Sequence, residues 1–135
     1  MWEEDLKQSK KQELAQRTLF VHQHYNTKQM KNITQKEWKS LISEDTNAVI
    51  IDSRRPEEWE QGIIESAVMI NIMDFEDFEQ KSKKLDLSKN YYVYCRSGVR
   101  SLRACDALEG LGVQTTYNLL GGILAWDGET VIPSL

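Results

Sequence analysis

Short, nearly uninterrupted apolar runs are the feature that most constrains how this chain folds. Three runs have the length of a β-strand, at residues 48–51, 67–72 and 91–94. Such runs are typical of strands covered on both faces, because a strand with one face in water alternates polar and apolar residues. Segments with helical signals separate the runs, and alternating strands and helices form mainly parallel sheets. The sequence therefore predicts an α/β fold with helices on both faces of the sheet.

The segments between the runs carry the start signals and the apolar spacing of helices. Thr34 and Glu37 form a capping box, in which each side chain accepts the backbone amide of the other residue. Phe75, Phe78 and Leu85 lie on one stripe at helical spacing. We expect helices over residues 34–42, 56–61, 74–85 and about 101–111, a strand over 115–119, a tight turn at 121–122 and a last helical turn over 123–126.

Composition and charge limit the classes of function. The chain has 135 residues, enough for one domain with a core, and its formal net charge is −4. This acidic balance lacks the basic surface of a nucleic-acid-binding protein, and no apolar run approaches the roughly 20 residues of a membrane span. The first residues lack the apolar segment of a secretory signal. We therefore expect a cytoplasmic protein without nucleic-acid or membrane partners.

Residues 1–29 differ in composition from the rest of the chain. They are rich in Gln, Lys and Glu, and they contain neither Gly nor Pro. We divide the chain into a polar extension over residues 1–29, which could be a packed helix or a frayed segment, and a folded domain over residues 30–135. The only histidines, His22 and His24, lie in the extension, far from both cysteines. We therefore expect no metal site.

The segment from Cys95 to Ser101 carries the most informative chemistry. Cys95 directly follows a predicted buried strand, and a helix is expected a few residues later. Ligands of open α/β sheets bind at this edge. Amides of a short loop before a helix can converge into an anion-binding nest, and Gly98 permits the turn that this requires. Arg96 and Arg100 add positive charge, and we expect at least one of them to face a substrate.

These surroundings favour a thiolate at Cys95. Comparable sites lower a cysteine pKa from about 8.5 to between roughly 3.5 and 7.5, because amides and cations stabilise negative charge on sulfur. The residues by themselves predict a nucleophilic cysteine in an anion-binding loop, and they leave sulfur transfer and phosphate-ester hydrolysis open. Cys105 shares a face of the following helix with Ala104 and Leu108, where we expect it to pack in the core.

Three blocks of sequence together resemble the rhodanese homology domain, over about residues 33–133. They are an Asp-x-Arg turn with a Glu-aromatic helix over residues 51–64, the loop over residues 95–101, and an Asn-Leu-Leu-Gly-Gly-Ile segment with a tryptophan over residues 118–126. The resemblance implies a five-stranded, mainly parallel sheet and a sulfurtransferase activity. Ile63 stands where the family often has histidine, and Thr116 replaces a usual aliphatic residue. We expect altered packing from Ile63 rather than lost activity.

The resemblance also implies a role for each residue of the site. Cys95 is implied to take sulfur from a small anionic donor such as thiosulfate, to carry it as a persulfide, and to pass it to a thiol or cyanide. No metal or organic cofactor is needed for this reaction. The residues implied to bind substrate are Arg96, Ser97, Gly98, Val99 and Arg100, and those implied to brace the loop are Asp52, Arg54 and Ser101.

Two other functions stay open beside this one. Related phosphatases and arsenate reductases share the fold but resemble Cys-x5-Arg, whose wider ring holds a tetrahedral oxyanion, whereas Cys95 to Arg100 is Cys-x4-Arg. The second alternative is a persulfide carrier module that acts only on a sulfur-accepting protein. We interpret Arg54 as a partner of Asp52 or of a loop carbonyl. Glu58 needs only the dipole of its helix as an explanation.

Overall fold

The computed structural model describes residues 30–134, so the predicted extension over residues 1–29, with both histidines, lies outside the described range. The helices are α2 (Gln35–Glu44), α3 (Pro56–Trp59), α4 (Phe75–Ser82) and α5 (Arg100–Leu111), with a 3-10 turn η1 (Ile123–Ala125). The strands are β1 (Lys31–Ile33), β2 (Ala48–Asp52), β3 (Ile63–Ile64), β4 (Val68–Met69), β5 (Asn90–Tyr94), β6 (Thr115–Leu119) and β7 (Thr130–Val131). Within the described range, no helix has the length and apolarity that a membrane crossing requires.

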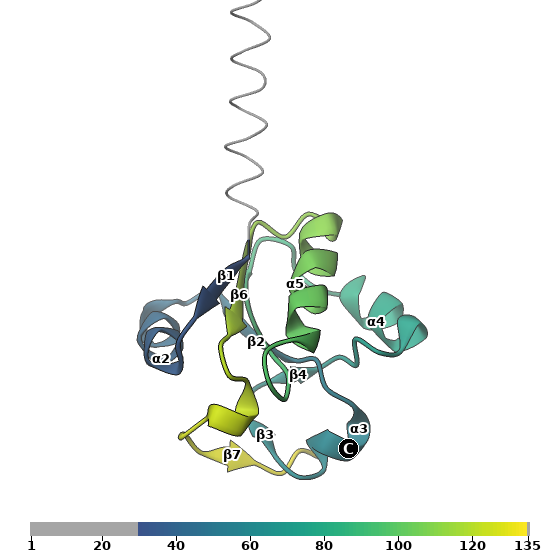
Figure 1. Ribbon diagram of the computed structural model, residues 1–135. Coiled ribbons are helices and arrows are strands. Elements are labelled where there is room, and N and C mark those ends of the chain that lie inside the picture. The colour runs from purple at the N-terminus through teal and green to yellow at the C-terminus, as the bar shows by residue number, and fades with distance from the viewer. Residues whose placement is uncertain (1–29, 135) are drawn as a thin grey trace, which may run out of the picture.

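Five strands form one parallel sheet in the order β1-β6-β5-β2-β4. α2 lies on one side of this sheet, and α4 and α5 lie on the other (Figure 1). A separate antiparallel pair joins β3 to β7. The α/β fold with a five-stranded parallel sheet and helices on both faces is therefore confirmed. β5 lies at the centre of the sheet, so its carboxyl end is flanked by the ends of β2 and β6.

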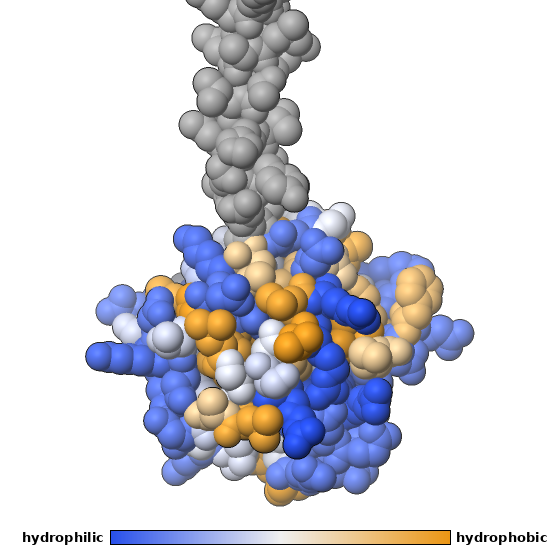
Figure 2. Space-filling model, viewed as in Figure 1, coloured by the Kyte–Doolittle hydropathy of each residue, from blue (hydrophilic) through white to orange (hydrophobic). Residues whose placement is uncertain are grey.

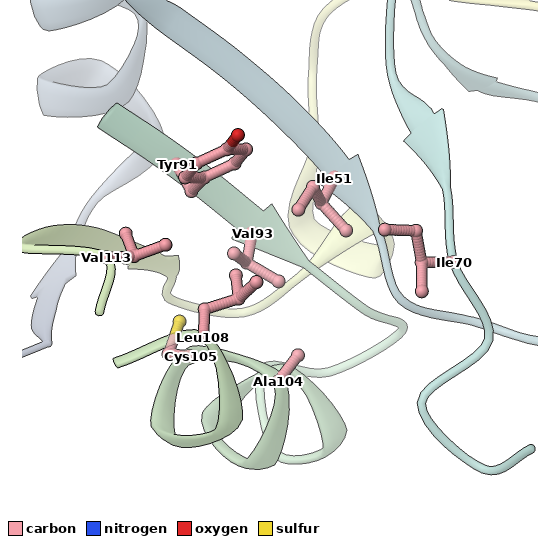
Figure 3. Close-up of a cluster of buried hydrophobic side chains, with 8 residues drawn as sticks. All are labelled: Ile51, Ile70, Tyr91, Val93, Ala104, Cys105, Leu108 and Val113. Atoms are coloured by element: carbon pink, nitrogen blue, oxygen red, sulfur yellow. The ribbon is translucent and has the colours of Figure 1, made fainter. Parts of the chain in front are cut away.

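Side chains of β5 point alternately to two apolar clusters, one on each face of the sheet. Tyr92 and Tyr94 belong to the cluster under α2, where Trp38 is 1% exposed. Because both faces of β5 are covered, its sequence is a continuous apolar run. The cluster under α5 consists of Ile51, Ile70, Tyr91, Val93, Ala104, Cys105, Leu108 and Val113 (Figure 3).

Three short strands carry no apolar run of their own. β1 has three residues, of which Lys31 and Asn32 are polar and exposed. β3 and β7 have two residues each. The predicted strand over residues 67–72 is confined to Val68–Met69 at the edge of the sheet, and the buried Ile70 lies beyond it. β4 therefore covers only part of the predicted apolar run, and Ile70 contributes to the cluster under α5 instead of to the strand.

α4 begins one residue later than its apolar spacing suggested. The Asp74 side chain accepts the amide of Asp77 and caps the helix, so Phe75 occupies the first turn. Phe75 is 77% exposed, whereas Phe78 and Leu85 pack against the cluster under α5. α4 ends at Ser82, before the predicted end at residue 85, and only Phe78 and Leu85 of the predicted stripe reach the core.

Candidate active site in the loop after β5

Cys95 lies immediately after the central strand, at the carboxyl edge of the sheet. The loop over residues 95–99 connects β5 to α5, which begins at Arg100. The register pairs Asp52 of β2 with Tyr94, and Asn118 of β6 with Val93. Residues of both neighbouring strands therefore lie beside the loop, at the edge that the sequence predicted for the site.

The Cys95 sulfur lies inside the loop and is surrounded by hydrogen-bond donors. Its Sγ is 3.1 Å from the amide nitrogen of Gly98 and 3.3 Å from Oγ of Ser101, and the residue has no exposed surface. Burial by itself raises the pKa of the thiol, but hydrogen bonds from the Ser101 hydroxyl and from the amides of Ser101, Gly98 and Ser97 outweigh it, so the pKa of Cys95 lies below its ordinary value. The sulfur has no surface open to solvent in this structure.

Asn118 fixes the turn of the loop, a role that the sequence analysis did not assign. Gly98 has φ +97°, and an added Cβ would lie 3.2 Å from the carbonyl oxygen of Leu119. The Asn118 amide donates to the Gly98 carbonyl at 3.0 Å, and its side-chain oxygen accepts from the Ser101 hydroxyl. That hydroxyl has one proton, so it serves either Asn118 or Cys95 Sγ at a given moment. The asparagine therefore couples loop shape to the charge state of the sulfur.

The Gly121-Gly122 turn holds the first half of the loop. The amide of Ile123 donates to the Cys95 carbonyl at 2.9 Å, and the amide of Leu124 donates to the Arg96 carbonyl at 3.1 Å. Gly122 has φ +59°, and an added Cβ would lie 2.4 Å from the Arg96 carbonyl oxygen. The sequence predicted a tight turn here, and the structure adds that this turn needs glycine because it touches the loop backbone.

Asp52 and Arg54 form a buried ion pair at the carboxyl end of β2, beside the end of β5. Nε and Nη2 of Arg54 donate to the Asp52 carboxylate at 2.6–3.1 Å, as the sequence analysis expected, and Nη2 also donates to the Gly62 carbonyl at 2.7 Å. Asp52 accepts the Tyr94 hydroxyl at 2.6 Å and the Trp59 indole at 3.2 Å. These contacts reach the strand residue before Cys95 rather than the loop itself. Burial, together with the Asp52 charge, raises the pKa of Tyr94, so its hydroxyl keeps its proton.

Arg100 makes a two-pronged ion pair with Glu58 of α3. Its two terminal nitrogens donate to the two carboxylate oxygens at 2.6 and 2.9 Å. Hydrogen bonds from Arg100 hold the pKa of Glu58 below its usual range. Interpreting Glu58 through its helix dipole alone was therefore incomplete. Nothing in the sequence pairs residues 42 positions apart, and only the fold brings α3 beside the start of α5.

A pocket of about 450 Å³ lies between the loop and α3. Figure 2 shows a largely hydrophilic surface over α3, whereas hydrophilic and apolar side chains are mixed over α5. Of the residues expected to bind substrate, Arg96 and Arg100 line this pocket, whereas Ser97 and Val99 are exposed outside its lining. The lining consists of Arg55, Glu58, Gln61, Arg96 and Arg100.

The loop is chemically suited to hold negative charge on one sulfur atom. Its donors converge on Sγ of Cys95, and the cationic pocket lies outside it. A family model for the rhodanese-like domain matches residues 34–129. The chain belongs to the rhodanese-like domain family.

Two relatives of this rhodanese-like domain carry names that describe them as putative sulfurtransferases. The chain is 38% identical over 102 residues to the protein named "Putative sulfurtransferase YtwF" of Bacillus subtilis, covering 76% of this chain and 95% of that protein. It is 32% identical over 129 residues to "Putative thiosulfate sulfurtransferase, mitochondrial" of Schizosaccharomyces pombe, covering 84% of this chain and 91% of that protein. A crystal structure of a rhodanese-like domain protein from Staphylococcus aureus is 32% identical, has a TM-score of 0.67, and covers 78% of this chain and 100% of that chain.

Two positions at which this rhodanese-like domain departs from the family pattern lie in well-packed surroundings. Ile63 is buried in β3 and pairs with Val131 of β7. Thr116 is buried in β6, and its hydroxyl donates to Glu109 of α5 at 2.9 Å. Neither residue lines the pocket outside the loop.

Proposed function

We propose that this rhodanese-like domain is a sulfurtransferase that carries sulfur on Cys95. The Cys95 thiolate attacks the outer sulfur of a donor such as thiosulfate, a sulfur–sulfur bond forms on Cys95, and the outer sulfur's bond to the sulfonate breaks. Sulfite leaves with the electron pair of that bond, and an anionic persulfide remains. In the second step a thiolate or cyanide attacks the outer persulfide sulfur, and the Cys95 thiolate is restored.

The observation that carries this proposal is the convergence of loop donors on one sulfur. The Gly98 amide and the Ser101 hydroxyl lie within hydrogen-bond distance of Sγ, and they counteract the cost of burying a thiolate. Donors fixed in a site stabilise developing charge without reorganising during the reaction. The same donors would stabilise the negative charge that the persulfide carries.

The geometry around Arg100 favours this reaction over phosphate-ester hydrolysis. A phosphatase of this fold needs its loop arginine to hold the oxyanion, but the Glu58 carboxylate takes two of the five N–H donors of Arg100 and offsets its charge. The loop from Cys95 to Arg100 is also one residue shorter than the phosphatase pattern. We therefore expect negligible hydrolysis of aryl phosphates.

An intact-mass measurement tests the proposal. After incubation with thiosulfate and removal of excess donor, the protein should gain the mass of one sulfur on Cys95, with release of an equal amount of sulfite. Cyanide should then restore the original mass and yield thiocyanate over many turnovers. If the protein gained no sulfur but hydrolysed aryl phosphates efficiently, the sulfurtransferase proposal would be wrong and the phosphatase function would be favoured. A sulfur gain without turnover on small acceptors would instead favour the persulfide carrier.

A further inference from the structure

The pocket outside the loop is lined by three arginines, of which only one is neutralised. Glu58 engages both terminal nitrogens of Arg100. Within residues 30–134, Arg55 and Arg96 form no ion pair. The pocket therefore keeps a net positive charge. Arg55, at the N-cap of α3, and Arg96, in the loop, supply this charge, whereas Arg100 at the start of α5 is neutralised.

Arg55 is placed in this pocket by the helix that follows it. It is the N-cap residue of α3, and its backbone amide lies 3.5 Å from the Glu58 carboxylate. Its side chain is exposed and lines the pocket together with Gln61, which follows the end of α3. The Glu58 carboxylate thus binds the Arg100 guanidinium and also lies near the backbone amide of Arg55. The charge of Glu58 therefore affects the electrostatic potential at both arginines.

We propose that Arg55, together with Arg96, binds the anionic group of the reagent that Cys95 attacks, and that Glu58 limits this attraction by neutralising Arg100. As a statement about sulfur donors this inference rests on the proposed function. The 450 Å³ volume of the pocket leaves room for donors larger than thiosulfate. Charge attracts anionic donors to an open pocket, and added salt weakens the effect.

The test compares two alkylating agents that differ in charge. Iodoacetate is anionic and iodoacetamide is neutral, and both react with the Cys95 thiolate through the same displacement of iodide. The ratio of their rate constants therefore cancels changes in the thiolate fraction and in access to the sulfur. Peptide mass spectrometry assigns the modified cysteine. The variants are Arg55→Gln, Arg96→Gln and Glu58→Gln, with Arg103→Gln as the matched control, because Arg103 is exposed on α5 and does not line the pocket.

The expected results have opposite signs for the two kinds of variant. Arg55→Gln and Arg96→Gln should lower the iodoacetate-to-iodoacetamide ratio about three- to tenfold, and Arg103→Gln should leave it unchanged. Glu58→Gln keeps an oxygen acceptor but releases the Arg100 charge, so it should raise the ratio. High salt should bring wild type and Arg55→Gln together.

Two outcomes would overturn the inference, and a separate readout follows the proposed function. Equal ratios in Arg55→Gln and Arg103→Gln would remove Arg55 from anion binding, and a lower ratio in Glu58→Gln would show that Glu58 does not restrain the attraction. The rate of persulfide formation with thiosulfate is measured in the same variants and should follow the alkylation ratio. If the wild type forms no persulfide while the alkylation ratio changes as expected in the variants, the proposed sulfur transfer is wrong, but the pocket still binds anions through Arg55 and Arg96.

Discussion

The two cysteines of this domain are equally buried and chemically opposite. Cys95 and Cys105 both have no exposed surface, and both are free thiols. Burial raises the pKa of Cys105 to about 12, whereas hydrogen bonds to Sγ bring the pKa of Cys95 below its ordinary value despite its burial. Cys105 lies among the side chains of the cluster under α5 (Figure 3), and its thiol donates a long hydrogen bond to the Tyr117 carbonyl at 3.8 Å.

The contrast shows what converts a buried thiol into a nucleophile. Burial acts in the same direction on both cysteines, because a low dielectric disfavours the thiolate. The difference comes from the hydrogen-bond donors around Cys95, the Ser101 hydroxyl first and then the amides of Ser101, Gly98 and Ser97. Cys105 is on α5, where its neighbouring amides are already used by the helix. Position at the end of a strand, before a helix, therefore decides the chemistry more than exposure does.

The largest expected effect separates the two cysteines by function. Cys95→Ser should abolish persulfide formation and turnover, because a hydroxyl fills similar space but is a far poorer nucleophile. Cys105→Ala should retain most of the wild-type rate. Thiocyanate production from thiosulfate and cyanide measures both variants, and circular dichroism verifies that each folds. Substantial turnover in Cys95→Ser would contradict the assignment of the nucleophile.

A shift of the loop backbone should remove the hydrogen-bond donors from the Cys95 sulfur and leave it a buried, unreactive thiol like Cys105. In Gly122→Ala the new Cβ would collide with the Arg96 carbonyl oxygen, so the loop must shift and its donors should no longer converge on the sulfur. We expect sulfur transfer to fall about 100-fold, since small misplacements of catalytic groups have such effects. Gly110→Ala is the control, because an added Cβ there meets nothing within 4 Å and replaces a glycine inside α5. Comparable loss of activity in both variants would show that the turn does not position the loop.

The sequence predicted the elements of the fold and site that depend on local pattern. The runs that became β2 and β5 are apolar because both of their faces are covered, and Cys95 directly follows one of them. The Glu58–Arg100 pair and the contact of Asn118 with the loop depend on how distant segments meet, and no local pattern encodes that. The one available signal was the resemblance, which included Asn118 in its third block without giving it a role.

A smaller effect is expected from removing one donor while the loop stays in place. Ser101→Ala should raise the pKa of Cys95, because the hydroxyl that stabilises the thiolate is lost. Alkylation by iodoacetamide at pH 6.5 should slow about tenfold, the size expected for one hydrogen bond to a charged group. The difference in rate should narrow as the pH rises, because a growing fraction of the sulfur is then ionised in both proteins.

The matched control for this serine lies on the neighbouring strand end. Ser53 is also buried, but its hydroxyl donates to the Tyr94 carbonyl at 2.8 Å rather than to the sulfur. Ser53→Ala should therefore lower thermal stability without moving the pH profile of Cys95 alkylation. Identical profiles in wild type and Ser101→Ala would mean that the backbone amides alone set the pKa of Cys95.

The smallest expected effect concerns the stability that Cys105 contributes, and it depends on pH. Cys105→Ala leaves a small cavity in the cluster under α5 and should lower the free energy of unfolding by about 1 kcal/mol at pH 7. The folded-state pKa of Cys105, about 12, lies above the roughly 8.5 of an unfolded thiol, so the wild type loses stability once pH rises past the unfolded value. At about pH 9.5 this loss reaches ~1.4 kcal/mol, and the variant, which has no thiol at this position, does not suffer it. Urea unfolding at both pH values should therefore show the gap between the two proteins closing or reversing, and a gap that stays constant would mean that Cys105 ionises as readily in the core as in the unfolded chain.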